Sequence, residues 1–187
     1  MNYAYELLQK QAELNKQLYT LLRFACKCEH VTSLTMNTYE SAIVFLAAKC
    51  SQIRIFNVGD TPLDTKLIDS YNTIAKDIEI DFKIEKLNEN FETTELLYIN
   101  TPAEGNYRAM ELGSYAPKVS KYIILNNTVA HAHKPSSNIK FADGIKPIGL
   151  VFGINHFLQE NDNWFILEHD DIQPGVTILI NKDNISC

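Results

Sequence analysis

The sequence predicts an α/β fold: a mostly parallel, twisted β-sheet with helices on both faces and an antiparallel strand at its C-terminal edge. Short segments that are apolar throughout alternate with segments of helical periodicity, which is typical of parallel strands buried on both faces. A turn signal at Gln173-Pro174-Gly175 separates the last two strand-like segments, which predicts an antiparallel pair. With 187 residues and 45% hydrophobic side chains, the chain is long enough for one sizeable core.

The first half of the chain alternates helix and strand. Apolar positions recur at three- and four-residue steps from Tyr3 to Cys28, without Gly or Pro, which predicts a helix in two pieces. β-Branched residues predict a strand at 30–35. Asp60 or Thr61 can cap the helix expected at about 62–76. The other elements expected in this half are a helix at 40–49, a strand at 52–58, a helix at about 62–76 and a strand at 80–84.

The second half repeats this alternation and then loses it. A strand at 96–100 precedes a helix at 103–115, and residues 122–125 form another apolar strand. Residues 126–146 show no regular pattern, and loops of that length inside a compact domain are usually functional or disordered. The chain closes with a helix at about 148–159 and strands at 164–168 and 176–180.

Charge and composition argue against several classes of function. The chain carries 17 basic and 23 acidic residues and no basic cluster, so no nucleic-acid partner is expected. No apolar stretch approaches the roughly 20 residues that a bilayer requires, so no membrane association is expected. No secretory pattern opens the chain, and a cytoplasmic location is expected. The cysteines, which are expected to be core-filling thiols, are Cys26, Cys28, Cys50 and Cys187.

Ligands of open α/β sheets bind beyond the carboxyl ends of the strands, and asparagines stand there after three of the predicted strands. They are Asn57, Asn100 and the pair Asn126-Asn127. An asparagine side chain both donates and accepts hydrogen bonds, but it lacks the negative charge that a divalent cation or a general base requires. Asparagine is also a common loop residue, so a structural interpretation stays open.

Three segments, Glu95–Thr101, Lys118–Thr128 and Gly175–Leu179, follow the pattern of a known family. From residue 18 to residue 180 the chain resembles the class I S-adenosylmethionine-dependent methyltransferases, and among them the small branch related to cephalosporin hydroxylase. The resemblance implies a Rossmann-like methyltransferase fold. It also implies cofactor-binding positions, which fall on Thr35, Asn37, Tyr39, Glu40, Asn57 and Asn100.

The chain departs from the family at the positions that the resemblance assigns to cofactor and metal. The stretch Ser33–Glu40 has no glycine, so side chains stand where the cofactor would approach the backbone. Asn57 replaces an acidic residue that would accept hydrogen bonds from the ribose. Acidic positions after the fourth and fifth strands are matched by Asn100-Thr101 and Asn126-Asn127-Thr128. Since Mg²⁺ depends on carboxylates, no metal is expected at this place.

These departures favour a pseudoenzyme, which keeps the methyltransferase fold without the family's ordinary chemistry and uses no cofactor. It would bind a different small molecule in the crevice at the carboxyl ends of the strands, or a protein partner. The alternative is an active S-adenosylmethionine-dependent methyltransferase or related group-transfer enzyme on a small molecule or sugar. A third hypothesis is an interaction module that docks through Tyr3–Cys28, and a homodimer contact through Trp164 and Phe165 is an alternative to their burial in the core.

The catalytic candidates are His131, His133 and Asn127. In an extended segment, histidines two residues apart project on the same side, which suits a shared transition metal or an acid/base pair. Ordinary solvated loop histidines are the alternative. Glu40 either stabilises a helix N-terminus or replaces the lost acidic residue, and Tyr39 either stacks on an adenine-like ring or closes the pocket.

The predicted organisation is a single domain. Residues 1–28 form an N-terminal helical segment that packs on the Rossmann-like domain of residues 29–187.

Overall fold

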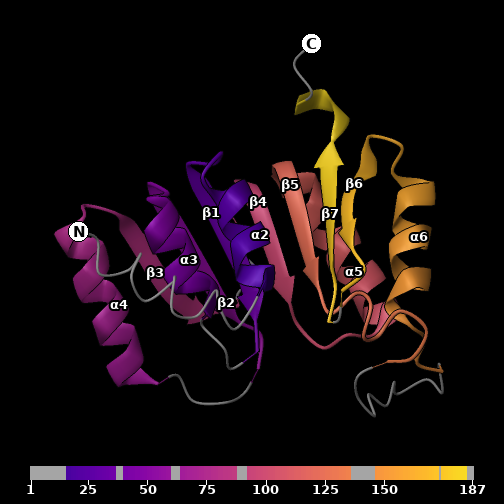
Figure 1. Ribbon diagram of the computed structural model, residues 1–187, viewed down its shortest axis with the longest axis horizontal. Coiled ribbons are helices and arrows are strands. Elements are labelled where there is room, and N and C mark those ends of the chain that lie inside the picture. Colours follow the sequence, from indigo (N-terminus) through magenta and orange to yellow (C-terminus); the bar gives the residue numbers. More distant parts are fainter. Residues whose placement is uncertain are drawn as a thin grey trace. The chain divides into compact units, whose positions relative to one another are not determined.

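The computed structural model describes residues 16–36, 40–59, 64–87, 92–135, 146–172 and 174–184. Its seven strands have the order β3-β2-β1-β4-β5-β7-β6 (Figure 1), which confirms the predicted α/β class. The chain divides into two compact units, unit 1 of residues 1–99 and unit 2 of residues 100–187. The single domain expected from the sequence stays a prediction.

The predicted strands and helices that fall on described residues are all present, with their ends shifted by a few residues. The strands are β1 (His30–Thr35), β2 (Gln52–Asn57), β3 (Asp81–Lys86), β4 (Thr94–Asn100), β5 (Val119–Asn126), β6 (Trp164–Asp170) and β7 (Val176–Asn181). The helices are α2 (Lys16–Ala25), α3 (Glu40–Ala48), α4 (Thr65–Asp77), α5 (Gly105–Tyr115) and α6 (Leu150–Glu160). The first part of the predicted N-terminal helix, residues 3–15, lies outside the described residues.

Unit 1 contains a parallel ladder in which β2 pairs with β1 on one side and with β3 on the other. The strands β1 and β2 are buried along almost their whole length, as their continuous apolar pattern predicts. Helix α3 is buried from Ser41 to Leu46. The Ser41 hydroxyl donates to Ser33 Oγ of β1 at 2.9 Å, so these buried hydroxyls satisfy each other.

Helix α4 begins later than the sequence predicts. Its N-cap is Asp64, whose carboxylate accepts a hydrogen bond from the Leu67 backbone N–H at 3.2 Å. The predicted caps, Asp60 and Thr61, lie outside the described residues, and the prediction that one of them caps α4 is wrong. An aspartate placed three residues before a free backbone N–H satisfies the same requirement from a later position.

Unit 2 contains the antiparallel part of the fold. Strand β7 is antiparallel to β5 on one side and to β6 on the other, which confirms the predicted pair. The ladder between β6 and β7 is irregular: Ile166 lies opposite Leu179 and Glu168 opposite Ile178, so Leu167 is an extra residue that forms a β-bulge.

Helices α5 and α6 of unit 2 approach each other through two glycines. A Cβ atom on Gly153 would lie 2.0 Å from the backbone oxygen of Gly105. Only glycine fits such a close contact, so this contact fixes the distance between the two helices. One turn further along α6, the Phe157 ring packs against the Trp164 ring with centroids 6.4 Å apart, and Trp164 is buried.

The cysteines of the described chain are thiols. Cys28 and Cys50 are buried and Cys26 is exposed, so core filling is confirmed for two of them. Burial raises the pKa of Cys50 to about 12, and its thiol donates to the Ala25 carbonyl. Cys187 lies outside the described residues. Among the helices described, none is long and apolar enough to cross a bilayer.

Candidate functional site

In unit 1, the ends of β1 and β2 carry two of the predicted cofactor-binding residues. Thr35 and Asn57 are opposite each other across the parallel ladder, and only 1% and 2% of their surfaces are exposed. The Asn57 Oδ1 atom accepts a hydrogen bond from the Gly59 backbone N–H at 3.3 Å, while the Asn57 carbonyl accepts one from Leu87 N. The Asn57 side chain is therefore buried and engaged with its own loop.

Of the other predicted residues at this end of unit 1, the structure describes Glu40. Glu40 is the first residue of α3 and is exposed there, a position at which a carboxylate interacts favourably with the helix N-terminus. Asn37 and Tyr39 lie outside the described residues.

In unit 2, the predicted asparagines at the ends of β4 and β5 come together. The Asn126 Nδ2 atom donates to Asn100 Oδ1 at 2.9 Å, and the Asn127 backbone N–H donates to Asn126 Oδ1 at 2.8 Å. Asn127 has a φ of 61°, a left-handed conformation that asparagine tolerates better than most residues. The side-chain amides of Asn100 and Asn126 thus hold the two strand ends together.

The segment after β5 is a series of turns, and the extended conformation assumed for the two histidines is wrong. The His131 backbone N–H donates to the Asn127 carbonyl at 3.2 Å, which closes a helix-like turn. His131 is half-buried and His133 is exposed. Among the residues that the structure describes, no three His, Cys, Asp or Glu side chains are grouped as a metal site requires. A catalytic role for His131, His133 or Asn127 stays a prediction.

A pocket of about 390 Å³ lies in unit 2 beside this turn, and we call it the α6–β6 pocket. One wall comes from the turn, one from α6 and one from β6 and the start of β7. Its lining residues are Thr128, Val129, Ala132, His133, Val151, Ile154, Asn155, Ile166, His169, Asp171 and Thr177. It includes His133 but not His131, so the two predicted histidines do not share it.

A buried pair of charged side chains in unit 2 was not predicted from the sequence. Arg108 of α5 is fully buried, and its Nη1 atom lies 3.5 Å from Oε2 of Glu111, which is 5% exposed. Thr101 donates its hydroxyl hydrogen to the same Oε2 atom at 2.9 Å. Burial raises the pKa of Glu111, and the Arg108 charge and the Thr101 hydrogen bond oppose that rise.

The signal for this group was present in the sequence but ambiguous. Arg108 and Glu111 are three residues apart on a predicted helix, which is equally typical of a solvated surface pair. The side chain of Glu104, which stands just before α5, caps that helix. It accepts hydrogen bonds from the backbone N–H groups of Tyr107 at 2.7 Å and Ile148 at 2.8 Å.

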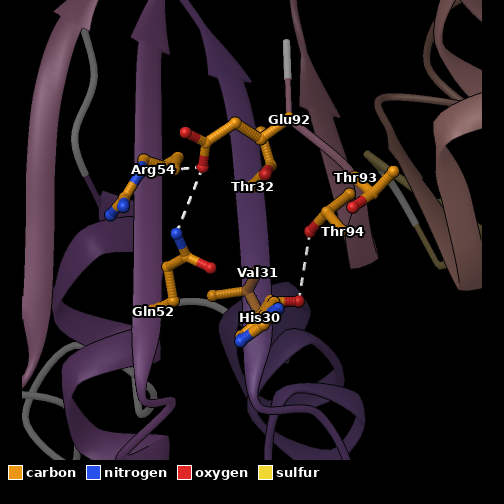
Figure 2. Close-up of a pocket in the computed structure, with 8 residues that line it drawn as sticks. All are labelled: His30, Val31, Thr32, Gln52, Arg54, Glu92, Thr93 and Thr94. Carbon is orange, nitrogen blue, oxygen red and sulfur yellow. Dashed lines mark hydrogen bonds and ion pairs between the residues drawn. The ribbon is translucent and has the colours of Figure 1, made fainter.

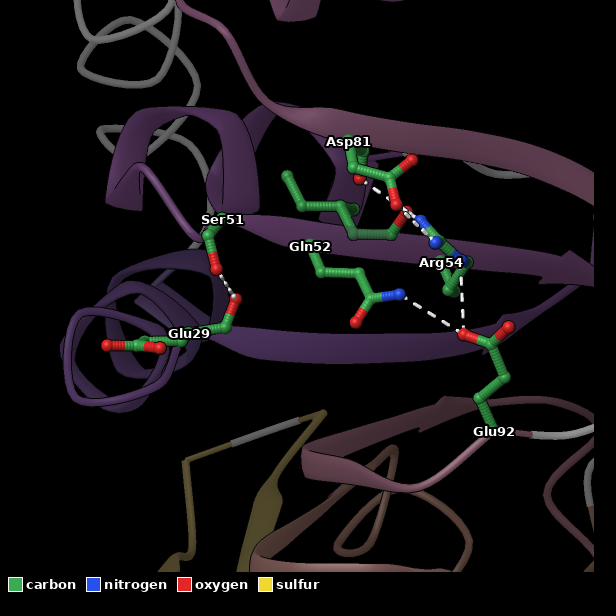
Figure 3. Close-up of polar contacts among 7 residues, drawn as sticks. Glu29, Ser51, Gln52, Arg54, Asp81 and Glu92 are labelled. Carbon is green, nitrogen blue, oxygen red and sulfur yellow. Dashed lines mark hydrogen bonds and ion pairs between the residues drawn. The ribbon is translucent and has the colours of Figure 1, made fainter.

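A polar cluster ties together the opposite, N-terminal ends of the unit 1 strands. Arg54 forms ion pairs with Asp81 at 2.5 Å and with Glu92 at 3.7 Å, and Gln52 donates to Glu92 at 3.1 Å (Figure 3). The Arg54 guanidinium donates a hydrogen bond to Asp81, which lowers the pKa of that carboxyl. The nearby hollow, which includes His30 and Thr94 (Figure 2), has a volume of about 0 Å³. It cannot hold a ligand, so the cluster is structural.

The chain matches no protein-family model and no curated protein sequence. Solved structures do match it. The O-methyltransferase from Bacillus cereus in complex with SAH is 13% identical, with a TM-score of 0.60 over 96% of this chain and 90% of that one. TomG from Streptomyces achromogenes, an O-methyltransferase involved in tomaymycin synthesis and solved with SAM, is 9% identical, with a TM-score of 0.59 over 97% and 90%.

The chain has the fold of class I methyltransferases. The Bacillus subtilis tRNA methyltransferase TrmK shares this fold at 14% identity and a TM-score of 0.54, over 91% of this chain and 70% of that one. Relatives in fold with such different substrates show that the fold alone assigns no substrate. Function must therefore be argued from the residues themselves.

Proposed function

We propose that this methyltransferase-fold protein does not bind S-adenosylmethionine in the usual way and instead binds a different small molecule. In this proposal it is a divergent, non-catalytic relative of the branch that includes cephalosporin hydroxylase, and it uses no metal at the usual place. The observation that carries the proposal is Asn57. Asn57 is 2% exposed and its Oδ1 atom already accepts a hydrogen bond from Gly59, so little of this amide is open to a ribose hydroxyl.

Free-energy arguments support the proposal. A hydrogen bond to a charged acceptor contributes about 1.5 to 3 kcal/mol, so an amide in place of the carboxylate weakens cofactor binding about tenfold or more. The stretch Ser33–Glu40 also lacks the glycine that would let a ligand approach the backbone. In unit 2, Asn100 and Asn126 hydrogen-bond each other and carry no charge for Mg²⁺.

The test is isothermal titration calorimetry of the wild-type chain with S-adenosylmethionine and S-adenosylhomocysteine. We expect no binding up to about millimolar concentration, and the Bacillus cereus O-methyltransferase serves as the positive control. The variant Asn57→Asp restores the acidic residue. We expect that it still does not bind S-adenosylmethionine with micromolar affinity, because its stretch Ser33–Glu40 still lacks glycine. Micromolar binding by the wild type would overturn the proposal.

The alternative is an active methyltransferase or related group-transfer enzyme on a small molecule or sugar. The whole-chain likeness to structures solved with SAM and SAH favours it. In that case S-adenosylmethionine would be the methyl donor, and the acid/base candidates are His131 and His133 beside Asn127. Transfer of a labelled methyl group that is lost in the variant His131→Ala/His133→Ala would support the alternative.

A further inference from the structure

We infer that the α6–β6 pocket binds a neutral, mostly apolar molecule that carries a hydrogen-bond donor. This inference deepens the proposed function, on which it rests, by giving the ligand a place and a chemical class. The pocket volume of about 390 Å³ falls within the range of roughly 300 to 1,000 Å³ that is typical of small-molecule sites.

The pocket has walls that are held in place by backbone hydrogen bonds. The N–H groups of Leu150 and Val151, at the start of α6, donate to the carbonyls of His131 and Ala132 in the turn at 3.0 and 3.1 Å. The Thr128 N–H donates to the Gly175 carbonyl, just before β7, at 3.2 Å. Turn, helix and strand are thus connected around the pocket, and a ligand would have little ordering cost to overcome.

The β-bulge in β6 places a polar end beside an apolar one. In a regular strand, side chains three residues apart point to opposite faces. Because Leu167 is an extra residue, Ile166 and His169 both line the pocket, and Asp171 follows two residues later on the same side. Apolar contact is therefore available near Ile166, and hydrogen bonds are available near His169.

The charges around the pocket select against an anionic ligand. Among its described lining residues there is one carboxylate, Asp171, and no Lys or Arg to balance a negative charge. Val129, Ala132, Val151 and Ile154 provide apolar walls. A charged group placed against them would lose hydration without gaining a partner, so the ligand body is neutral.

The polar end is rich in acceptors. His169 Nδ1 is hydrogen-bonded to Thr177 Oγ1 at 2.8 Å, and within the described chain its Nε2 atom has no partner. If Nδ1 carries the proton, Nε2 is an acceptor, and the Asn155 carbonyl and the Asp171 carboxylate are acceptors as well. A ligand N–H or O–H group satisfies such a set.

The experiment uses indole as the probe, because indole is flat, neutral and apolar with a single N–H donor, and indole-3-carboxylate as its anionic counterpart. We expect indole to bind the wild-type chain with submillimolar affinity in calorimetry and indole-3-carboxylate to bind at least about tenfold more weakly. The variant Val151→Trp fills the pocket and should abolish indole binding. The matched control is Phe152→Trp, the adjacent residue of α6, which is 55% exposed and does not line the pocket.

A third variant, His169→Phe, keeps an aromatic ring but removes both nitrogens. It should weaken indole binding about fivefold or more while the affinity for indole-3-carboxylate stays low. Circular dichroism melting checks that each variant is folded. Equal affinity for the two probes, or indole binding unaffected by Val151→Trp in a folded protein, would overturn the inference. If the wild type binds both S-adenosylmethionine and indole, the proposed function is refuted and the inference about the pocket stands. If it binds neither, the inference about the pocket is refuted and the proposed function stands.

Discussion

Removing either member of the buried pair Arg108 and Glu111 should destabilise the protein strongly, and removing both should destabilise it far less. The perturbations are Arg108→Met, Glu111→Leu and the double variant. Arg108 is fully buried and Glu111 is 5% exposed, so each single change leaves an uncompensated charge in the interior. Such a loss costs about 3 to 5 kcal/mol, whereas apolar replacement of a whole buried pair is often neutral.

In this structure the double variant loses one further interaction. Thr101 donates its hydroxyl hydrogen to Glu111, and in the double variant this buried hydroxyl loses its acceptor. That loss costs about 1 to 3 kcal/mol, so the double variant should be less stable than the wild type by only this amount. The two single effects together would be about 6 to 10 kcal/mol, which leaves a coupling of about 3 kcal/mol or more.

The assay is urea unfolding followed by circular dichroism. With a slope of about 2 kcal/mol per molar urea, a single variant should move the midpoint down by about 1.5 to 2.5 M. The double variant should have a higher midpoint than either single one. Additive effects, with a coupling below about 0.5 kcal/mol, would refute the conclusion that the two side chains depend on each other.

Three further predictions concern other titratable and reactive groups. The pKa of Glu111 is raised above its ordinary 4.5, so the folded state keeps a proton that the unfolded state loses. The urea midpoint of the wild type should therefore fall as pH rises above about 4.5, and the midpoint of Glu111→Leu should fall less. Mg²⁺ should show no heat of binding in calorimetry, and any zinc binding should disappear in His131→Ala/His133→Ala with the fold intact; zinc binding unaffected by that change would place the metal elsewhere. Cys50, with a pKa of about 12, should resist iodoacetamide until urea is added, while exposed Cys26 reacts at once; equal labelling of both in the folded protein, measured by peptide mass spectrometry, would contradict its burial.

Strand positions could be predicted from this sequence because burial on both faces leaves a continuous apolar pattern. The segment 122–125, for example, lies within β5, whereas its antiparallel pairing with β7 was not predicted. Helix starts were harder to predict. Asp60, Thr61 and Asp64 are all chemically suited to cap α4, and only the path of the backbone decides among them.

The candidate site could be predicted less well, because it depends on contacts between residues that are distant in the sequence. The strand-end asparagines were found, but not that Asn126 donates to Asn100, 26 residues away. The two histidines were assumed to lie on an extended segment, whereas the hydrogen bond from His131 to Asn127 makes a turn. The spacing of the two histidines in the sequence contained no information about that hydrogen bond. The α6–β6 pocket depends on the bulge at Leu167, which a hydrophobic pattern does not reveal.

That bulge has a consequence for how the protein can change during evolution. Leu167 has no partner of its own in the ladder, so deleting it would leave Ile166 opposite Leu179 and Glu168 opposite Ile178. His169 would still pair with Thr177 and would stay at the pocket. Loss of this one codon would therefore regularise the outer strand without exchanging the polar end of the pocket. Relatives of this chain could thus differ in the length of β6 while the pocket keeps its ligand preference.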